Sequence, residues 1–334
     1  MNLEERIGAF SKLAAAMENI PEQLFFQAES QNPWFTVDNQ KQAVKSWINQ
    51  LSNENLNAWL KPYQLKENMQ SQNVLIIMAG NIPLVGFHDL LSVLITSNKA
   101  VIKMSSHDSV LLPYIIDMLV KIESRFADFV GFIEDVKGKK FDAIIATGSN
   151  QSAKYFEYYF QDVKKIIRKN RNSLAVLDGS ESKTDLSNLA KDVFSYFGLG
   201  CRNVSKVFLP KNYDLDLLFE AFYSFQDIIE HKKYANNYDY HKSIFLMGSH
   251  QLIENGFLLL KEDTSLNSPL AMLHYEYYED MRQVEKYIEE HEEKLQCVVS
   301  KDKIPFGQAQ NPHLWNYADG VDSIALLTNQ STNS

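Results

Sequence analysis

Three short apolar runs, each followed by small residues and then by a helix-like stretch, constrain the fold of this chain more than any other feature. They cover residues 74–77, 100–103 and 141–146. Continuous apolar runs of about 4–8 residues are typical of strands that are buried on both faces of a parallel sheet. Strand, turn and helix repeated in this order predict a doubly wound α/β fold.

The rest of the chain extends this pattern. We expect helices over residues 2–17 and 37–60, and a second α/β unit after residue 172. The expected strands of that unit cover residues 174–177, 207–209, 243–246, 271–273, 295–299 and 323–327, and its expected helices cover residues 186–197, 215–229 and 281–291. The sequence therefore predicts two doubly wound α/β lobes with a short helical N-terminal region.

Composition and charge exclude several classes of protein. The chain has 334 residues, a formal net charge of -9 at pH 7 and two cysteines. An acidic chain is a poor match for the phosphates of nucleic acid, so we expect no nucleic-acid partner. Two cysteines make no disulfide framework, and the sequence shows neither an export signal nor an apolar stretch suited to span a membrane. We therefore expect a cytoplasmic protein.

Cys201 is the first candidate for chemistry. It lies in the turn 197–203, where Gly198 and Gly200 precede it and Arg202 follows it. Glycine lets a backbone approach a ligand closely, and a nearby cation lowers the pKa of a thiol, so this turn has the make-up of an exposed nucleophile. The alternative is a small, buried and inert thiol in a helix-to-strand connection. Cys297, in an apolar run, is expected in a buried strand.

Polar residues follow each of the first three predicted strands. Because ligands of such sheets bind beyond the carboxyl ends of the strands, Asn81, Lys103 and Ser149 are expected on one rim. The Asn81 amide can donate to a developing oxyanion or cap the next helix. Lys103 can reach a ribose or phosphate, or extend to solvent, and Ser105 and Ser106 are expected to cap a helix. Thr147, Gly148 and Ser149 offer a hydroxyl and backbone N–H groups at another helix start, a weak motif by itself.

Other residues carry weaker signals. The basic residues 164–171 can attract phosphates or form a solvated helix face. No histidine spacing indicates a metal site, and we predict none; His241 is either a proton donor or a surface residue. The aromatic residues of two predicted helices can line an apolar tunnel or form core, and they are Phe194, Tyr196, Phe197, Phe222, Tyr223 and Phe225.

The order and spacing of these motifs resemble those of the aldehyde dehydrogenase superfamily. The motifs are residues 79–83, 103–106, 146–149 and 198–201. Within that superfamily, residues 197–203 and the ending 317–324 resemble the acyl-CoA reductases related to LuxC, and the similarity extends from about residue 74 to about residue 327. The helical N-terminus is the least diagnostic part.

The resemblance implies a role for each motif. Cys201 is the expected nucleophile and Asn81 the expected oxyanion-hole amide. The cofactor, NADPH with NADH as the alternative, is expected near Lys103, Ser105 and Ser106 at its adenosine ribose and near Thr147, Gly148 and Ser149 at its pyrophosphate. The expected parts are a helical N-terminal region packed on the coenzyme lobe (1–70), a coenzyme-binding lobe (71–172), a catalytic lobe with Cys201 (173–305), and a C-terminal return and candidate oligomerisation segment (306–334). A homodimer or higher homo-oligomer is expected.

Two departures from the superfamily pattern bear on the reaction. Aldehyde-oxidising members carry a glutamate base in the strand before the cysteine, where this chain has residues 174–179 with Asp178. The motif that holds the nicotinamide ribose is replaced by residues 266–269. A base is needed to activate water in oxidation, whereas reduction of an acyl-CoA needs no such water.

The sequence therefore favours NADPH-dependent reduction of an acyl-CoA to an aldehyde. The alternatives are an acyl-phosphate reductase, a CoA-acylating aldehyde dehydrogenase, and a non-catalytic scaffold that binds a nucleotide or a partner.

Overall fold

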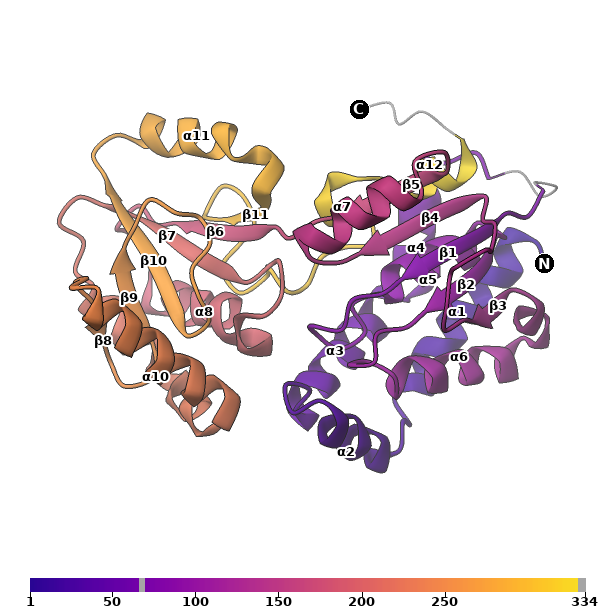
Figure 1. Cartoon of the computed structure of the whole chain (residues 1–334), viewed down its shortest axis with the longest axis horizontal. Coiled ribbons are helices and arrows are strands. Elements are labelled where there is room, and N and C mark those ends of the chain that lie inside the picture. The colour runs from indigo at the N-terminus through magenta and orange to yellow at the C-terminus, as the bar shows by residue number, and fades with distance from the viewer. Residues whose placement is uncertain (66–69, 330–334) are drawn as a thin grey trace. The chain divides into compact units, whose positions relative to one another are not determined.

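The chain divides into two compact units. The computed structural model describes residues 1–65 and 70–329 (Figure 1). One unit comprises residues 1–170 and the segment from residue 313 to the C-terminus, of which residues 330–334 lie outside the described part. The other comprises Arg171–Pro312. The expected division by role, at residues 70, 172 and 305, stays a prediction.

The first unit contains a five-stranded sheet in the order β3-β2-β1-β4-β5. All four pairings are parallel. Its strands are β1 (Asn73–Ile77), β2 (Lys99–Lys103), β3 (Val130–Phe132), β4 (Ala143–Thr147) and β5 (Lys164–Arg168). Successive strands are added outward from β1, first β2 and β3 on one side and then β4 and β5 on the other. The direction of winding therefore reverses between β1 and β4. The doubly wound parallel sheet predicted from the apolar runs is confirmed.

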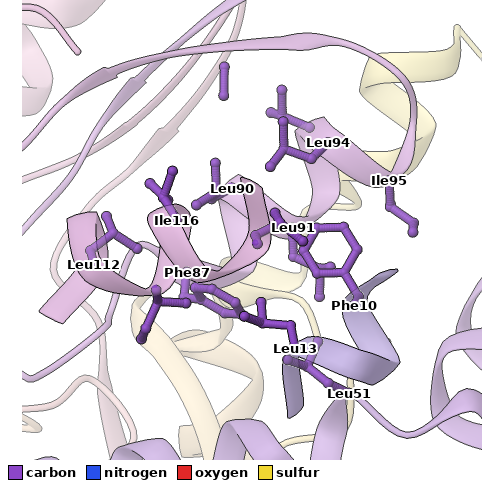
Figure 2. Close-up of a cluster of buried hydrophobic side chains, with 14 of the residues drawn as sticks. Phe10, Leu13, Leu51, Phe87, Leu90, Leu91, Leu94, Ile95, Leu112 and Ile116 are labelled. Carbon is purple, nitrogen blue, oxygen red and sulfur yellow. The ribbon is translucent and has the colours of Figure 1, made fainter. Parts of the chain in front are cut away.

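Helices cover both faces of this sheet. They are α1 (Leu3–Met17), α2 (Glu22–Gln31), α3 (Val37–Gln50), α4 (Asn53–Leu60), α5 (Phe87–Ile95), α6 (Leu111–Ile122), α7 (Asn150–Tyr159) and α12 (Ser323–Thr328), with 3-10 turns at Ser124–Asp128 and Ala318–Gly320. On one face, α5 and α6 pack against α1, and Figure 2 shows Phe10, Leu91 and Ile116 in the buried cluster between them. On the other face, Phe156 of α7 packs against the alternate strand residues, such as Ile144.

The second unit contains a six-stranded sheet in the order β11-β6-β7-β10-β9-β8. Its strands are β6 (Asn172–Val176), β7 (Val204–Pro210), β8 (Ile253–Glu254), β9 (Leu259–Glu262), β10 (Met272–Tyr278) and β11 (Leu295–Val299). Only β8 runs antiparallel to its neighbour among the described strands. The helices are α8 (Lys183–Phe194), α9 (Asp216–Phe222), α10 (Lys232–Met247) and α11 (Met281–Glu290), with 3-10 turns at Ser195–Gly198, Tyr223–Glu230 and Glu292–Lys294.

Several predicted elements are wrong. Residues 243–246 belong to α10, because a short apolar run fits a helix as well as a strand. Residues 323–327 form the buried helix α12, which Asp322 caps by accepting a hydrogen bond from the Ala325 N–H. Residues 37–60 form two helices, since Ser52 begins a new one as its N-cap. The helix α2 was not predicted.

The basic stretch 164–171 is also not a helix. Residues 164–168 form the edge strand β5, and their cations contact the chain itself. Lys165 donates to the carbonyls of Phe160 and Gln161, and Lys164 to Asn329. Residues 164–168 therefore form no helical face, and Lys164 and Lys165 are already bound to other groups of the chain.

A buried ion pair ties β5 to helix α5 and to the C-terminal segment. Arg168 Nη2 lies 2.6 Å from an Asp89 carboxylate oxygen, and both side chains are almost fully buried. Arg168 Nη1 donates to the Ala318 carbonyl at 2.6 Å, so the same guanidinium holds the returning segment. A buried cation that loses its counter-charge is costly, because the surrounding protein solvates it poorly.

Replacing Asp89 with alanine is therefore expected to lower the free energy of unfolding by about 3–5 kcal/mol. Urea denaturation of Asp89→Ala and wild type measures the difference. Lys121→Ala is the matched control: it breaks the exposed pair between Lys121 and Asp117 and should leave stability almost unchanged. Equal effects of the two substitutions would show that burial of the Arg168 pair does not matter.

Candidate active site

The predicted rim of the first unit exists as a row of loops at one edge of the sheet. Ile77 of β1 is in register with Lys103 of β2 and with Ala146 of β4, so the three strands end side by side. The segments that follow them start at Met78, Met104 and Gly148. This edge includes the point where the strand order reverses, the place at which open α/β sheets bind ligands.

The loops after β1 and β2 touch at Gly80. A Cβ built on Gly80 would lie 2.4 Å from Ser105 Oγ, so no larger residue fits there without a shift. Asp108 joins the same two loops, since its carboxylate accepts a hydrogen bond from the Leu84 N–H at 2.9 Å. Burial raises the pKa of Asp108 to about 6. Leu84 has a left-handed φ of 58°, a conformation that costs energy and that this contact stabilises.

Asn81 is exposed in the bend after β1. Helix α5 begins at Phe87 with Gly86 as its N-cap, five residues beyond Asn81, so the cap interpretation of Asn81 is wrong. Lys103, the last residue of β2, is half-buried, and within the described residues its Nζ forms no hydrogen bond or ion pair.

The serines of the two rim loops differ in what they bind. Ser149 lies at a helix start, as predicted, and caps α7, because its Oγ accepts a hydrogen bond from the Ser152 N–H at 3.2 Å. Ser105 and Ser106 cap no helix: α6 begins at Leu111, and Ser105 Oγ accepts instead from the His107 N–H. The Gly148 N–H donates to the Arg168 carbonyl, so it serves the sheet edge.

In the second unit, the Cys201 turn connects α8 to β7 through an unusual backbone. Tyr196 and Phe197 have φ values of 53° and 58°, and Gly198 follows with a φ of 78°. Left-handed conformations at residues other than glycine cost about 1–3 kcal/mol each and occur where the surrounding structure enforces them. Cys201 itself is half-buried.

Ser173 lies between the two cysteines. Its Oγ donates to the Cys201 carbonyl at 2.9 Å and lies 3.0 Å from Cys297 Sγ. Cys297 is in β11, as predicted, next to Ser173 of β6. Burial raises the pKa of the Cys297 thiol, although the Arg202 charge acts in the opposite direction. The cation that the sequence places behind Cys201 thus acts on Cys297.

Strand β6 contains no glutamate, but the loop that follows it holds two carboxylates, those of Asp178 and Glu181. Lys301 pairs with Asp178 at 2.9 Å and holds the pKa of that carboxyl well below its usual range. The Glu181 side chain accepts from the N–H groups of Asp178 and Gly179, and burial raises its pKa. Glu181 was not predicted as a site residue, although it lies shortly after a predicted buried strand.

The aromatic and histidine candidates mostly serve the core. Phe194 and Phe222 are buried, with ring centroids 5.5 Å apart, and Phe225 stacks on Phe194, whereas Tyr223 is exposed. His241 lies half-buried on α10. Among the described residues, no group of three or more His, Cys, Asp or Glu side chains is arranged to hold a metal ion. The same residues include no helix long and apolar enough to cross a membrane.

Comparison with known proteins identifies the class. A structure of P. syringae indole-3-acetaldehyde dehydrogenase AldA, with NAD+ and IAA, matches with a TM-score of 0.66 and 12% identity over 86% of this chain and 70% of that chain. The aldehyde dehydrogenase KauB from Pseudomonas aeruginosa gives 0.66 and 13%, over 90% and 72%. The NADP-dependent glyceraldehyde-3-phosphate dehydrogenase from Bacillus halodurans gives 0.62 and 14%, over 90% and 75%. The chain thus has the aldehyde dehydrogenase fold.

The family follows from a separate match. The model of the acyl-CoA reductase (LuxC) family matches residues 3–218, more than half of the chain, and the chain belongs to this family. It is an oxidoreductase that acts on aldehyde or acyl groups. The match includes the N-terminal helices, which the sequence motifs did not, and ends before the segment 317–324. A search of curated proteins found no significant match.

The two thiols are expected to differ in reactivity. Burial of the sulfur raises the pKa of the Cys297 thiol, so Cys297 should react slowly with iodoacetamide near neutral pH and faster as the pH rises. Cys201 should take up most of the label near neutral pH, and peptide mass spectrometry reads out both rates. Equal rates, or faster labelling of Cys297, would contradict an activated Cys201.

Proposed function

We propose that this protein reduces an acyl-CoA thioester to an aldehyde with NADPH, through an acyl group bound to Cys201. The observation that carries the proposal is the glycine-flanked, strained turn that presents Cys201, within the stretch that matches the acyl-CoA reductase family. Left-handed backbone conformations at residues other than glycine cost energy and cluster at functional sites. Presenting a nucleophile is one function that such a strained turn can serve.

In the proposed reaction, the Cys201 thiolate attacks the thioester carbonyl and forms a tetrahedral oxyanion. The Cys201 N–H donates a hydrogen bond to that oxyanion, and the family resemblance assigns the Asn81 amide the same role. CoA leaves as a thiolate that takes up a proton, and the acyl group stays on Cys201 as a thioester. The carbonyl carbon then accepts the hydride that bound NADPH would supply. The carbon–sulfur bond then breaks, which releases the aldehyde and restores the Cys201 thiolate.

The rim of the first unit suits a dinucleotide. Gly80 and Gly148 pack closely against the neighbouring loop and helix, since a Cβ would lie 2.4 Å from Ser105 Oγ at Gly80 and 3.0 Å from Ser152 Cβ at Gly148. We assign Lys103, Ser105 and Ser106 to the adenosine ribose, and Thr147, Gly148 and Ser149 to the pyrophosphate. Structural neighbours were solved with NAD+ or NADP, which supports a nicotinamide cofactor.

The reductive direction is supported by the loop after β6. Oxidation to an acid needs a free carboxylate base that activates water. Asp178 is paired with Lys301, and the Glu181 carboxylate accepts two backbone N–H groups, so both carboxylates already serve the loop. Both residues also follow the end of β6 that lies away from Ser173 and the Cys201 turn, so neither is an available base for water at the thioester on Cys201.

Replacing Cys201 with alanine is expected to abolish acyl-CoA reduction while cofactor binding persists, since the cofactor is assigned to other residues. The measurement is NADPH consumption with acyl-CoAs from short to long chains, with NADH in parallel. Cofactor binding is followed by NADPH fluorescence. Cys297→Ala is the matched control and should keep most of the activity.

The outcomes of this experiment separate the alternatives. Turnover that Cys201→Ala retains would overturn the proposal. No turnover with any acyl-CoA, combined with fast alkylation of Cys201, would replace the acyl-CoA with an acyl phosphate or a carrier-bound acyl group. Slow alkylation as well would favour the non-catalytic scaffold.

Asn81→Ala is expected to lower kcat by about 100- to 1000-fold, because one oxyanion donor is lost. The KM for NADPH should change little, since that amide is assigned to the acyl group. Steady-state kinetics of Asn81→Ala and of Asn57→Ala, an exposed asparagine of α4, test this. A kcat within a factor of about two of the wild type would remove Asn81 from the mechanism.

A further inference from the structure

The side chain of Asn203, two residues after Cys201, forms hydrogen bonds within the turn and with the end of α8. It is 4% exposed. Its Oδ1 accepts a hydrogen bond from the Gly200 N–H at 2.8 Å, and its backbone N–H donates to the Gly200 carbonyl at 3.0 Å. Its Nδ2 donates to the carbonyls of Asp192, Val193 and Ser195, at 3.1, 3.3 and 2.8 Å. An amide has two N–H groups, so one of them is shared between two carbonyls.

Those three carbonyls belong to the end of α8, where a helix leaves carbonyl groups without partners in the helix. The Asn203 amide supplies partners and thereby joins the helix end to the Cys201 turn. The strained residues Tyr196 and Phe197 lie between the two joined points. The Asn203 amide therefore holds this loop in its strained conformation. Without it, Tyr196 and Phe197 could leave their left-handed conformations, which would lower the conformational energy of the loop.

The hydrogen bonds between Asn203 and Gly200 also determine the direction in which the Cys201 N–H points. The Gly200 carbonyl and the Cys201 N–H lie in one trans peptide plane and point in opposite directions within it. The Asn203 backbone N–H holds the Gly200 carbonyl, and Asn203 Oδ1 holds the Gly200 N–H in the preceding peptide plane, so Gly200 is fixed on both sides and the Cys201 N–H has one direction. The carbonyl of Cys201 is held separately, by Ser173 Oγ at 2.9 Å. The peptide plane after Cys201 is therefore anchored by the buried Ser173 side chain, and the plane before it by the backbone of Asn203, whose buried side chain holds the other side of Gly200.

We propose that Asn203 and Ser173 are positioning residues for Cys201. They set the backbone on each side of it and so aim both the thiol and the N–H that donates to the oxyanion. This inference rests on the proposed function in one respect, that Cys201 is the nucleophile. Neither residue touches the substrate; each acts through the Cys201 backbone.

The test uses the full chain with Asn203→Ala, Asn203→Asp and Ser173→Ala. A displacement of about 1 Å in a reacting group can cost about 100-fold in rate, so Asn203→Ala should lower kcat by about that factor. Asn203→Asp keeps the acceptor for Gly200 but turns a second oxygen towards three carbonyls, so its loss should be at least as large. Ser173→Ala should lower kcat in the same sense by a smaller factor. The Kd for NADPH should not change in any of them.

Asn255→Ala is the matched control for a purely structural loss. Its amide oxygen accepts two hydrogen bonds, from the N–H groups of Phe257 and Leu258, and these do not involve the backbone of residues 198–203. It should lower the melting temperature while kcat stays near the wild-type value. An Asn203→Ala variant that loses melting temperature like Asn255→Ala but keeps its kcat would overturn the proposal.

Alkylation of Cys201 in a Cys297→Ala background keeps the inference separate from the proposed function. If acyl-CoA is not reduced but Cys201 is alkylated rapidly, the alkylation rate replaces kcat, and a rate that Asn203→Ala leaves unchanged overturns the positioning role. If Asn203→Ala does not fold, Ser173→Ala decides, and an unchanged kcat in it counts against the proposal. Slow alkylation of wild-type Cys201 overturns the proposed function, and the inference with it.

Discussion

The parallel pairing of β1 with β2 and β4 is the constraint on which the first unit depends. Residues 74–78 are buried, and helices cover both faces of the sheet, so every side chain of the central strand must be apolar. Polar groups are excluded until the strand ends. Because parallel strands end at the same edge, the loops that bear polar residues gather there, and Gly80, Lys103 and Gly148 meet the same rim. The same physical rule thus produces both the core and the place where a ligand can bind.

In the second unit, the end of α8 has the corresponding role. Asp192 is fully buried, and its carboxylate accepts from the N–H groups of Gly307 and Ala309 at 2.6 and 3.0 Å. Burial raises the pKa of this carboxyl to about 6. The carbonyl of the same residue accepts from Asn203. One helix end therefore anchors two segments distant in sequence, and the local strain at Tyr196 and Phe197 is balanced by contacts that the rest of the unit supplies.

The sequence predicted the parallel sheets and the rim because these depend on local apolar runs and on the rule for strand ends. It failed where one pattern serves two structures. The apolar run 243–246 fits a strand and a helix equally. It is helical because it continues α10, which begins eleven residues earlier at Lys232. The basic run 164–171 was taken as a solvated face or a phosphate site, whereas Arg168 is neutralised by Asp89, 79 residues away in the chain. Contacts at that distance leave no trace in a local pattern, and the same holds for Ser173 and Cys201.

The chemistry of the site follows the same division between local and distant information. A cysteine between glycines and an arginine is visible in the sequence, but its geometry depends on Asn203, Ser173 and the end of α8. A reductase needs a nucleophile that is held still and an acyl intermediate that water does not reach with the help of a base. The first condition requires buried anchors on both sides of Cys201, which this chain has. The second concerns carboxylates that could activate water: Asp178 and Glu181 follow the end of β6 away from Ser173, which contacts Cys201, and Lys301 engages Asp178 there. The proposed reaction therefore depends on side chains that do not themselves react as much as on the thiol.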